Sequence, residues 1–261
     1  MQTSYSRHYV DLWQRHWWWR SRHRYVMRRI RGQLAGRDTA DRPDILDIGC
    51  CGGVMFDDLS KFAEPYGIEP DPQLAPAVPR WSNRVEQVSF GGDYRTDRTY
   101  DVTLMLDVLE HIEDESGAVR ALYELVAPGG MAVLTVPALP ALWSVHDDAN
   151  LHFRRYTRRS LVTALSGAGF ELQRVEYLFG WSLPLVAARR FVARSIPEDY
   201  RVSVPPRPIN WLFEGLTRVE QRVSETLRIP LPLGSSLLAI ARRPDGARVA
   251  DHPTSSMAGA L

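Results

Sequence analysis

The sequence is poor in lysine and cysteine, and it has no long apolar run. Lys61 is the only lysine among 261 residues, so the chain has neither a Gly-Lys-Ser/Thr phosphate loop nor a lysine in a Schiff-base signature. The two cysteines, Cys50 and Cys51, are adjacent and have no third cysteine to pair with, which favours a reducing compartment. No stretch reaches the ~18 apolar residues of a membrane span, and the N-terminus has no apolar signal region. We therefore expect a cytoplasmic protein.

The charge balance argues against a nucleic-acid partner. The formal net charge is +1, whereas a dedicated nucleic-acid binder usually has a strong basic excess. Apolar residues make up 44% of the chain and charged residues 24%, which is ordinary for a globular protein. The length is sufficient for one large α/β domain, with or without a helical appendage.

Alternating apolar and helical segments predict an open, doubly wound and mostly parallel sheet. We predict strands at 44–48, 66–69, 85–90, 100–106, 131–136, 171–178 and 235–241. Helices are expected from the glycine-rich turn to residue 62 and over 116–126, 159–167, 185–194 and 209–227. The predicted fold class is thus α/β with seven strands, an N-terminal helix and a helical insertion before the last strand.

The same pattern divides the chain into three parts. Residues 1–36 form an aromatic and basic helical segment, and residues 37–243 form the main domain. Within that domain, residues 181–233 contain several prolines between segments with a helical pattern. We expect them to form a lid-like helical insertion. Residues 244–261 are small and polar, which predicts a disordered tail.

A glycine-rich turn follows the first predicted strand, in the run from Ile45 to Gly53 (ILDIGCCGG). Glu69 ends the second strand about twenty residues later, where nucleotide-binding folds place an acid that accepts hydrogen bonds from ribose hydroxyls. A nicotinamide dehydrogenase uses the same acid, but its GxGxxG pattern requires glycines at positions 49, 51 and 54, where Cys51 and Val54 interrupt it. Asp47, just before the turn, suits a cationic ligand better than a pyrophosphate. The alternative without a ligand is a tight strand-to-helix turn.

The turn resembles the glycine motif of the class I S-adenosylmethionine-dependent methyltransferases, Asp-x-Gly-Cys-Gly-x-Gly. Asp47, Gly49, Cys50 and Gly53 match the motif, and Cys51 replaces its middle glycine. The runs LDVLEH (106–111) and LVAPGG (125–130) resemble the family's segments after strand four and before strand five. The runs HWWWRSR (16–22) and LWSVHDD (142–148), continuing to HFRRY (152–156), resemble a bacterial type 11/23-like subgroup. The resemblance covers about residues 40–180.

This resemblance implies a Rossmann-like fold, S-adenosyl-L-methionine as cofactor and a set of binding residues. Glu69 is expected to hold the ribose hydroxyls and Asp93 the adenine amino group. Asp107 would lie near the methionine portion, whose amino acid end contacts the glycine turn. The cofactor-binding residues implied in this way are Asp47, Gly49, Cys50, Gly53, Glu69, Asp93 and Asp107.

For the acceptor, the sequence offers histidines, tryptophans and arginines near the ends of the predicted strands. We expect His111 and His146 to serve as general bases if the acceptor loses a proton, because histidine titrates near neutral pH; the alternative for His111 is local packing. Arginine matches oxyanions well, although the alternative is pairing with the nearby aspartates. No metal site is expected. The predicted acceptor-contacting residues are Trp18, Trp143, His152, Arg155 and Tyr156.

The expected function is therefore methyl transfer from S-adenosylmethionine to the oxygen or carbon of a small-molecule or lipid-like acceptor. The alternatives are an NAD-dependent oxidoreductase and a catalytically silent S-adenosylmethionine-binding protein. The tryptophan-rich N-terminus and the apolar helices near Trp181 and Trp211 also resemble interfacial segments. Because lid helices have the same pattern, membrane contact is the less favoured interpretation.

Overall fold

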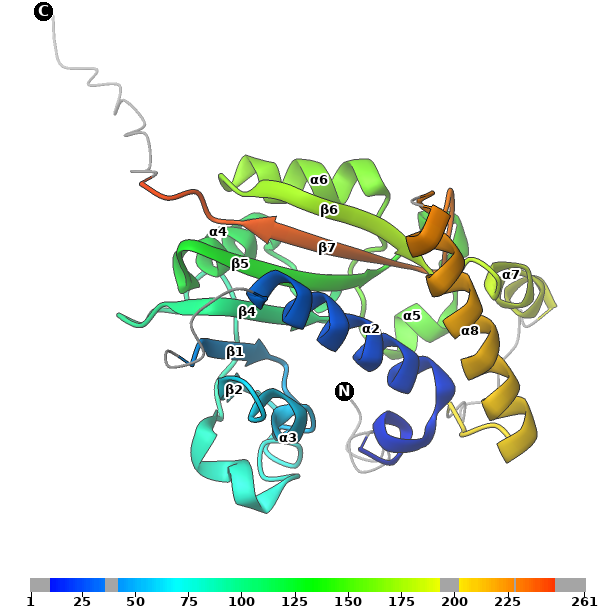
Figure 1. Ribbon diagram of the computed structural model, residues 1–261, viewed down its shortest axis with the longest axis horizontal. Helices are drawn as coiled ribbons and strands as arrows, with labels where there is room; N and C mark the ends of the chain where they lie inside the picture. Colours follow the sequence, from blue (N-terminus) through cyan, green and yellow to red (C-terminus); the bar gives the residue numbers. More distant parts are fainter. Residues whose placement is uncertain (1–9, 36–41, 193–201, 228, 247–261) are drawn as a thin grey trace, which may run out of the picture.

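The structure is a computed structural model that describes residues 10–35, 42–192, 202–227 and 229–246. Its centre is a seven-stranded sheet with the order β3-β2-β1-β4-β5-β7-β6 (Figure 1). Neighbouring strands are parallel except where β7 pairs with β5 and with β6, so the sheet is mixed. The predicted α/β fold with seven strands is confirmed. The strands are β1 (Asp44–Ile48), β2 (Glu64–Ile68), β3 (Val85–Glu86), β4 (Tyr100–Leu106), β5 (Val126–Pro137), β6 (Glu171–Leu178) and β7 (Ser236–Arg242).

Helices cover both faces of the sheet. On one face lie α2 (Trp17–Leu34), which crosses the sheet in Figure 1, and the short α3 (Phe56–Leu59). On the other lie α4 (Glu115–Leu125) and α6 (Arg158–Gly167). The remaining helices, α5 (Val145–Ala149), α7 (Leu183–Val192) and α8 (Arg207–Leu227), lie near the ends of β5 and β6.

Buried side chains alternate between the two faces of the central strands. In β4, Leu104 and Leu106 pack toward α2, whereas Met105 packs toward α4. In β5, Val133 packs toward α2, and Leu134 packs toward α4. This alternation explains why the central strands are continuous apolar runs, because a strand covered by helices on both faces is buried at every position.

Three predicted elements differ in length from the observed ones. β3 has only two residues, because Val88 N bonds back to Glu86 O and ends the pairing with β2. α3 has four residues, since the chain must turn before β2 begins at Glu64. β5 begins at Val126, earlier than predicted, and passes through Pro128 to Gly130 with a register shift in its pairing with β4.

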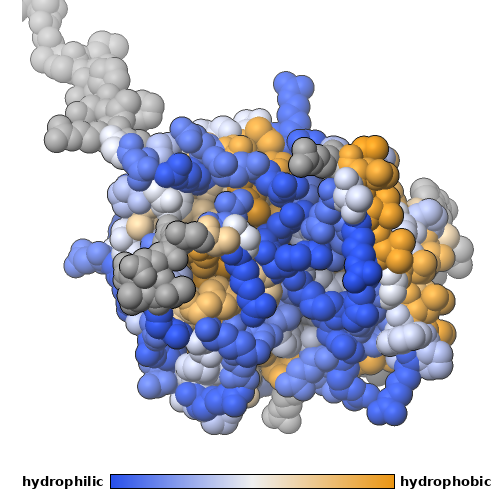
Figure 2. Space-filling view, in the orientation of Figure 1, coloured by the Kyte–Doolittle hydropathy of each residue, from blue (hydrophilic) through white to orange (hydrophobic). Residues whose placement is uncertain are grey.

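Helix α8 has an unusual orientation, because its polar face is buried and its apolar face is exposed. The buried residues are Asn210, Glu214, Thr217 and Gln221. The exposed apolar side includes Leu212, Leu216, Val219, Val223 and Leu227, with exposed fractions between 41% and 60%. Figure 2 shows hydrophobic surface along the side of the molecule where α8 lies. None of the described helices is long and apolar enough to cross a membrane.

The polar face of α8 binds α2. Glu214 is 1% exposed and forms ion pairs with Arg20 (2.9 Å) and Arg24 (3.1 Å) of α2 and with Arg218 (3.3 Å) of its own helix. Asn210 accepts a hydrogen bond from Trp17 N (2.7 Å), at the first residue of α2. These contacts explain why the polar stripe of α8 faces inward.

Replacing Glu214 with alanine is expected to lower the free energy of unfolding by about 2 kcal/mol, because charge-assisted hydrogen bonds are lost and arginines are left unpaired. Val219→Ala, on the exposed face, is the matched control and should change it by no more than about 0.5 kcal/mol. Urea unfolding measures both. A larger loss for Val219→Ala than for Glu214→Ala would contradict the orientation of α8.

Candidate functional site

A cavity of about 1510 Å³ lies at the carboxyl ends of β1, β2 and β4, below the start of α2. In an open α/β sheet this is the edge where ligands bind. Each of these strands contributes the residues that follow its end, and α2 covers the opening with tryptophans. The predicted site residues that line the cavity are Trp18, Gly49, Glu69, Asp107, His111, His146, His152 and Arg155.

The glycine-rich turn after β1 has an uncommon backbone. Gly49, Cys51 and Gly52 all have positive φ angles, of 74°, 49° and 70°. At Gly52 a Cβ atom would lie 2.3 Å from Leu74 O, so only glycine fits there. Cys51 adopts the left-handed conformation as well, although this conformation costs a residue with a side chain roughly 1–2 kcal/mol.

Glu69 connects this turn to the end of β2. Its Oε2 accepts a hydrogen bond from Cys51 N (2.9 Å), and its Oε1 accepts one from Asp71 N (3.0 Å). The side chain is 5% exposed, and burial raises the pKa of its carboxyl group despite these hydrogen bonds. Each carboxylate oxygen can accept a second hydrogen bond. Glu69 thus has acceptor capacity at the cavity wall for two neighbouring hydroxyl groups of a ligand.

A second group of charges lies where β1 and β4 end. Asp47 is 3% exposed, and burial raises its pKa to about 7, an effect opposed by Arg22. Arg22 reaches down from α2 and forms an ion pair with Asp107, whose Oδ1 accepts a hydrogen bond from Thr135 Oγ1 (3.2 Å). Asp107 has a φ of 56°, and strained backbone of this kind clusters at functional sites.

The other six predicted site residues do not line the cavity, and Asp47, described above, is one of them. Cys50 and Gly53 belong to the glycine-rich turn, and burial raises the pKa of the Cys50 thiol well above its usual range. Asp93 is exposed, and the cavity wall after β3 is formed by Ser89 and Phe90. Trp143 is 39% exposed and donates its indole N–H to Asp148 Oδ1 (3.0 Å).

Tyr156 also lies away from the cavity. Its side chain is 1% exposed and belongs to the hydrophobic core between β5 and α6. Its backbone pairs with the end of β5: Tyr156 N donates to Pro137 O (2.9 Å), and Leu139 N donates to Tyr156 O (2.8 Å). The structure therefore gives Tyr156 a packing position, with no contact to the space an acceptor could occupy.

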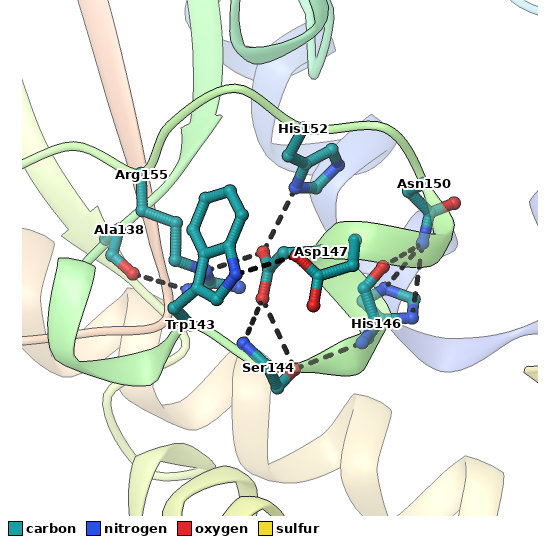
Figure 3. Close-up of polar contacts among 9 residues, drawn as sticks. Ala138, Trp143, Ser144, His146, Asp147, Asn150, His152 and Arg155 are labelled. Carbon is teal, nitrogen blue, oxygen red and sulfur yellow. Dashed lines mark hydrogen bonds and ion pairs between the residues drawn. The ribbon is translucent and has the colours of Figure 1, made fainter.

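A fully buried aspartate organises the loop that follows β5 (Figure 3). Asp147 Oδ1 accepts hydrogen bonds from Arg155 Nε (2.7 Å) and from the imidazole Nδ1 of His152 (3.0 Å). Its Oδ2 accepts one from Ser144 N (2.9 Å). Arg155 also donates to Ala138 O (2.6 Å). Of the two sequence interpretations of Arg155, the structure shows the pairing with an aspartate.

The predicted catalytic histidines come from different segments but line the same cavity. His146 lies in α5, with its ring nitrogens 3.3 and 3.4 Å from Asn150 Nδ2. His111 follows β4, and its ring centroid is 4.7 Å from that of His152. Burial, and secondarily His152, lower the pKa of His111 to about 4, so its ring is neutral at pH 7.

Sequence reasoning missed Glu110 as a separate site residue. Glu110 is 1% exposed, lines the cavity next to His111, and burial raises its pKa to about 8. The signal was its place in the LDVLEH run directly after a buried strand. A glutamate at such a position usually faces solvent, so the run alone did not indicate that this one is buried.

Aromatic side chains from distant segments form another wall of the cavity. The rings of Trp17, Trp181 and Phe213 have centroids 5.1 to 5.4 Å apart. Trp18 stacks on Phe179 at 5.4 Å and carries Arg22 over its own face. The predicted tryptophan run and the predicted helical insertion therefore meet over the cavity.

A model of a protein family described as "Methyltransferase domain" matches residues 18–175, which is more than half of the chain. Two similar relatives are a ubiquinone biosynthesis O-methyltransferase of Ruegeria pomeroyi and its mitochondrial counterpart in Schizosaccharomyces pombe. The first is 28% identical over 123 residues, covering 42% of this chain and 48% of the relative. The second is 33% identical over 101 residues, covering 35% of this chain and 36% of the relative. The chain thus matches less than half the length of these relatives.

Solved structures share the fold at low identity. The N-methyltransferase NodS from Bradyrhizobium japonicum, in complex with S-adenosyl-L-homocysteine, has a TM-score of 0.52 and 16% identity, covering 87% of this chain and 88% of its own. A 1,6-didemethyltoxoflavin-N1-methyltransferase from Burkholderia thailandensis, bound to that compound and S-adenosylhomocysteine, has a TM-score of 0.53 and 15% identity, with 85% and 78% covered.

Proposed function

Because the chain belongs to the methyltransferase domain family, we propose that it transfers a methyl group from S-adenosylmethionine to a hydroxyl oxygen of a small-molecule acceptor. The observation that carries this proposal is the position of Glu69, buried between the glycine-rich turn and the cavity, with both carboxylate oxygens oriented by backbone N–H groups. The names of the relatives, which are O-methyltransferases, support oxygen as the acceptor atom.

The residues at the crevice fit a nucleoside that carries a positive charge. Glu69 holds the ribose hydroxyls through its remaining lone pairs, and the turn at Gly49 allows close approach of the amino acid end. Asp47 and Asp107 supply negative charge, and Arg22 offers N–H groups to a carboxylate. When bound, S-adenosylmethionine supplies an electrophilic methyl group on a sulfonium sulfur.

The protein's own contribution is positioning, exclusion of water and removal of one proton. Methyl transfer is an in-line displacement, so catalysis depends mainly on holding two reactants at the right distance. Trp17, Trp18 and Trp181 cover the cavity and keep water out. His146 lines the same cavity and accepts the hydroxyl proton of the acceptor.

The acceptor has an aromatic or apolar body. The cavity wall formed by Trp18, Trp181 and Phe213 offers ring faces against which such a body packs. Helix α8 supplies Phe213 to this wall, and helices α7 and α8 have exposed apolar side chains, including Leu185 and Leu212. A lipid-like tail that leaves the cavity beside these helices would therefore meet apolar surface.

Equilibrium binding and product analysis test the proposal together. Calorimetric titration is expected to show binding of S-adenosylmethionine and no binding of NAD at the same concentration. Incubation of host extracts with the protein and isotopically labelled methyl donor should then label a hydroxyl-bearing compound, as detected by mass spectrometry. Binding of NAD alone would support the oxidoreductase instead. Binding of S-adenosylmethionine without turnover would support a silent binding protein.

The affinity for S-adenosylmethionine is expected to rise about tenfold from pH 6 to pH 8. Asp47 has a pKa of about 7, raised by burial, lowered in part by Arg22 and raised again by Glu69. At pH 6 it is mostly protonated and neutral, and at pH 8 it is ionised and attracts the cationic ligand. Calorimetry across this range measures the change. Asp47→Asn should flatten it, and an equal pH dependence in that variant would contradict the assignment.

A further inference from the structure

We propose that Glu110, His111 and His152 form a binding site for one divalent transition-metal ion, of the Zn²⁺ or Mn²⁺ type, at the wall of the acceptor cavity. Each of the three side chains offers one ligand atom, and these atoms lie within 4.8 Å of one another. All three residues line the cavity. The ion site shares this cavity with Glu69 and the glycine-rich turn but uses none of their side chains.

The separations are close to those of a formed site. Metal–nitrogen and metal–oxygen bonds of about 2.0–2.2 Å place neighbouring tetrahedral ligands roughly 3.5 Å apart. The separations of the ligand atoms are at most 4.8 Å, so binding of an ion has to draw the most distant pair together by about 1.3 Å. Two imidazoles and one carboxylate are a ligand set typical of zinc and other first-row ions, whereas Mg²⁺ and Ca²⁺ prefer oxygen ligands.

Both histidines are oriented as metal-binding histidines usually are. His152 Nδ1 donates to Asp147 Oδ1 at 3.0 Å, which leaves Nε2 as the nitrogen with an available lone pair (Figure 3). The backbone groups of Asn150 and Leu151 lie close to the His111 ring and favour its N–H form. Such second contacts fix the tautomer and the direction of each ring.

Glu110 provides the most direct sign that a cation belongs here. Its side chain is 1% exposed, and within the described part of the chain its Oε2 has no hydrogen-bond partner. A buried carboxylate oxygen without a partner is costly, and coordination of a cation removes this cost. Asp147 does not serve the same purpose, because Arg155, His152 and Ser144 already bind its oxygens.

Three protein ligands leave a coordination position for another oxygen. Because the three residues lie at the cavity wall, that position faces the space assigned to the acceptor. There the ion binds the acceptor hydroxyl, lowers its pKa and favours loss of its proton to His146. The resulting oxygen forms the new O–CH₃ bond, while the S–CH₃ bond breaks and its electron pair remains on sulfur. This role rests on the proposed function, whereas binding of the ion does not.

Direct measurement of the ion tests the site. The full-length protein is freed of metal by dialysis against a chelator and then titrated with Zn²⁺ and with Mn²⁺ by calorimetry, and elemental analysis counts the bound ion. We expect one ion per chain. Glu110→Gln and His152→Ala should weaken binding at least 100-fold, and Asp147→Asn, which weakens the second contact to His152 together with the pairing to Arg155, about tenfold. Thermal unfolding of each metal-free variant confirms that it is folded.

His23→Ala is the matched control, since His23 of α2 binds Asp58 of α3 and does not line the cavity. It should bind the ion as the unaltered protein does. The inference is overturned if neither metal binds in a ratio of one to one, or if Glu110→Gln binds as tightly as the unaltered chain. Titration with S-adenosylmethionine separates the two proposals: ion binding without cofactor binding would leave the metal site intact and remove the methyltransferase assignment.

Discussion

Replacing Glu69 with alanine is expected to weaken the binding of S-adenosylmethionine by about 100-fold. The variant loses the proposed hydrogen bonds to the ribose hydroxyls and the two backbone hydrogen bonds, from Cys51 N and Asp71 N, that shape the crevice. Hydrogen bonds to a charged group contribute about 1.5–3 kcal/mol each, and about 2.7 kcal/mol corresponds to a factor of 100. Isothermal titration calorimetry measures the dissociation constant.

Two further variants make this test specific. Glu69→Gln keeps the size of the side chain and one carbonyl acceptor, so it should retain part of the affinity. Glu86→Ala removes an exposed carboxylate at the end of the neighbouring strand β3 and should bind the cofactor as before. An affinity for Glu69→Ala within threefold of that of the unaltered protein would exclude the ribose assignment.

Replacing Asp147 with alanine is expected to lower the free energy of unfolding by about 3–5 kcal/mol. The side chain is fully buried and pairs with Arg155, which is itself 6% exposed. Removal of one partner leaves a buried guanidinium charge without compensation, and this is among the most costly single changes in a folded protein. Ser144 N loses its acceptor at the same time, so the capping box of α5 keeps only the hydrogen bond accepted by the Ser144 side chain.

Urea unfolding followed by circular dichroism gives this free energy. Asp148→Ala is the control at the next position. Asp148 is exposed, and its side chain accepts a hydrogen bond from the indole N–H of Trp143, which is also exposed. It should cost less than about 1 kcal/mol. If Asp147→Ala and Asp148→Ala destabilise the protein equally, the network in Figure 3 has no special role in stability.

Most of the fold could be predicted from the sequence, because the central strands are buried on both faces. Runs such as YDVTLML and SLLAIA are apolar at nearly every position, and this pattern has few interpretations when turns and helices separate the runs. The lengths of β3 and α3 could not be predicted in the same way. They depend on local turns at Glu86 and before Glu64, which leave no periodic signal.

The positions of site residues could be predicted where a residue directly follows a strand. They were harder to predict where a residue lies within a loop. Glu69 and Asp107 follow β2 and β4 directly, so their place at the cavity follows from the parallel sheet. Asp93 and Trp143 lie in loops, and the direction of a loop side chain depends on contacts that are remote in sequence. His152 was predicted to contact the acceptor, but its hydrogen bond to Asp147 could only be found from the structure.

The strand order has a consequence for how the chain is made. Among the described residues, β6 joins the sheet only through β7, which lies between it and β5 and is the last of the described strands along the sequence. During synthesis, therefore, β6 emerges from the ribosome without its partner, and the edge of β5 stays open until residues 236–242 follow. Open edges of this kind favour aggregation. A chain released before β7, even one containing all of the matched methyltransferase region, would thus be a substrate for chaperones and proteases.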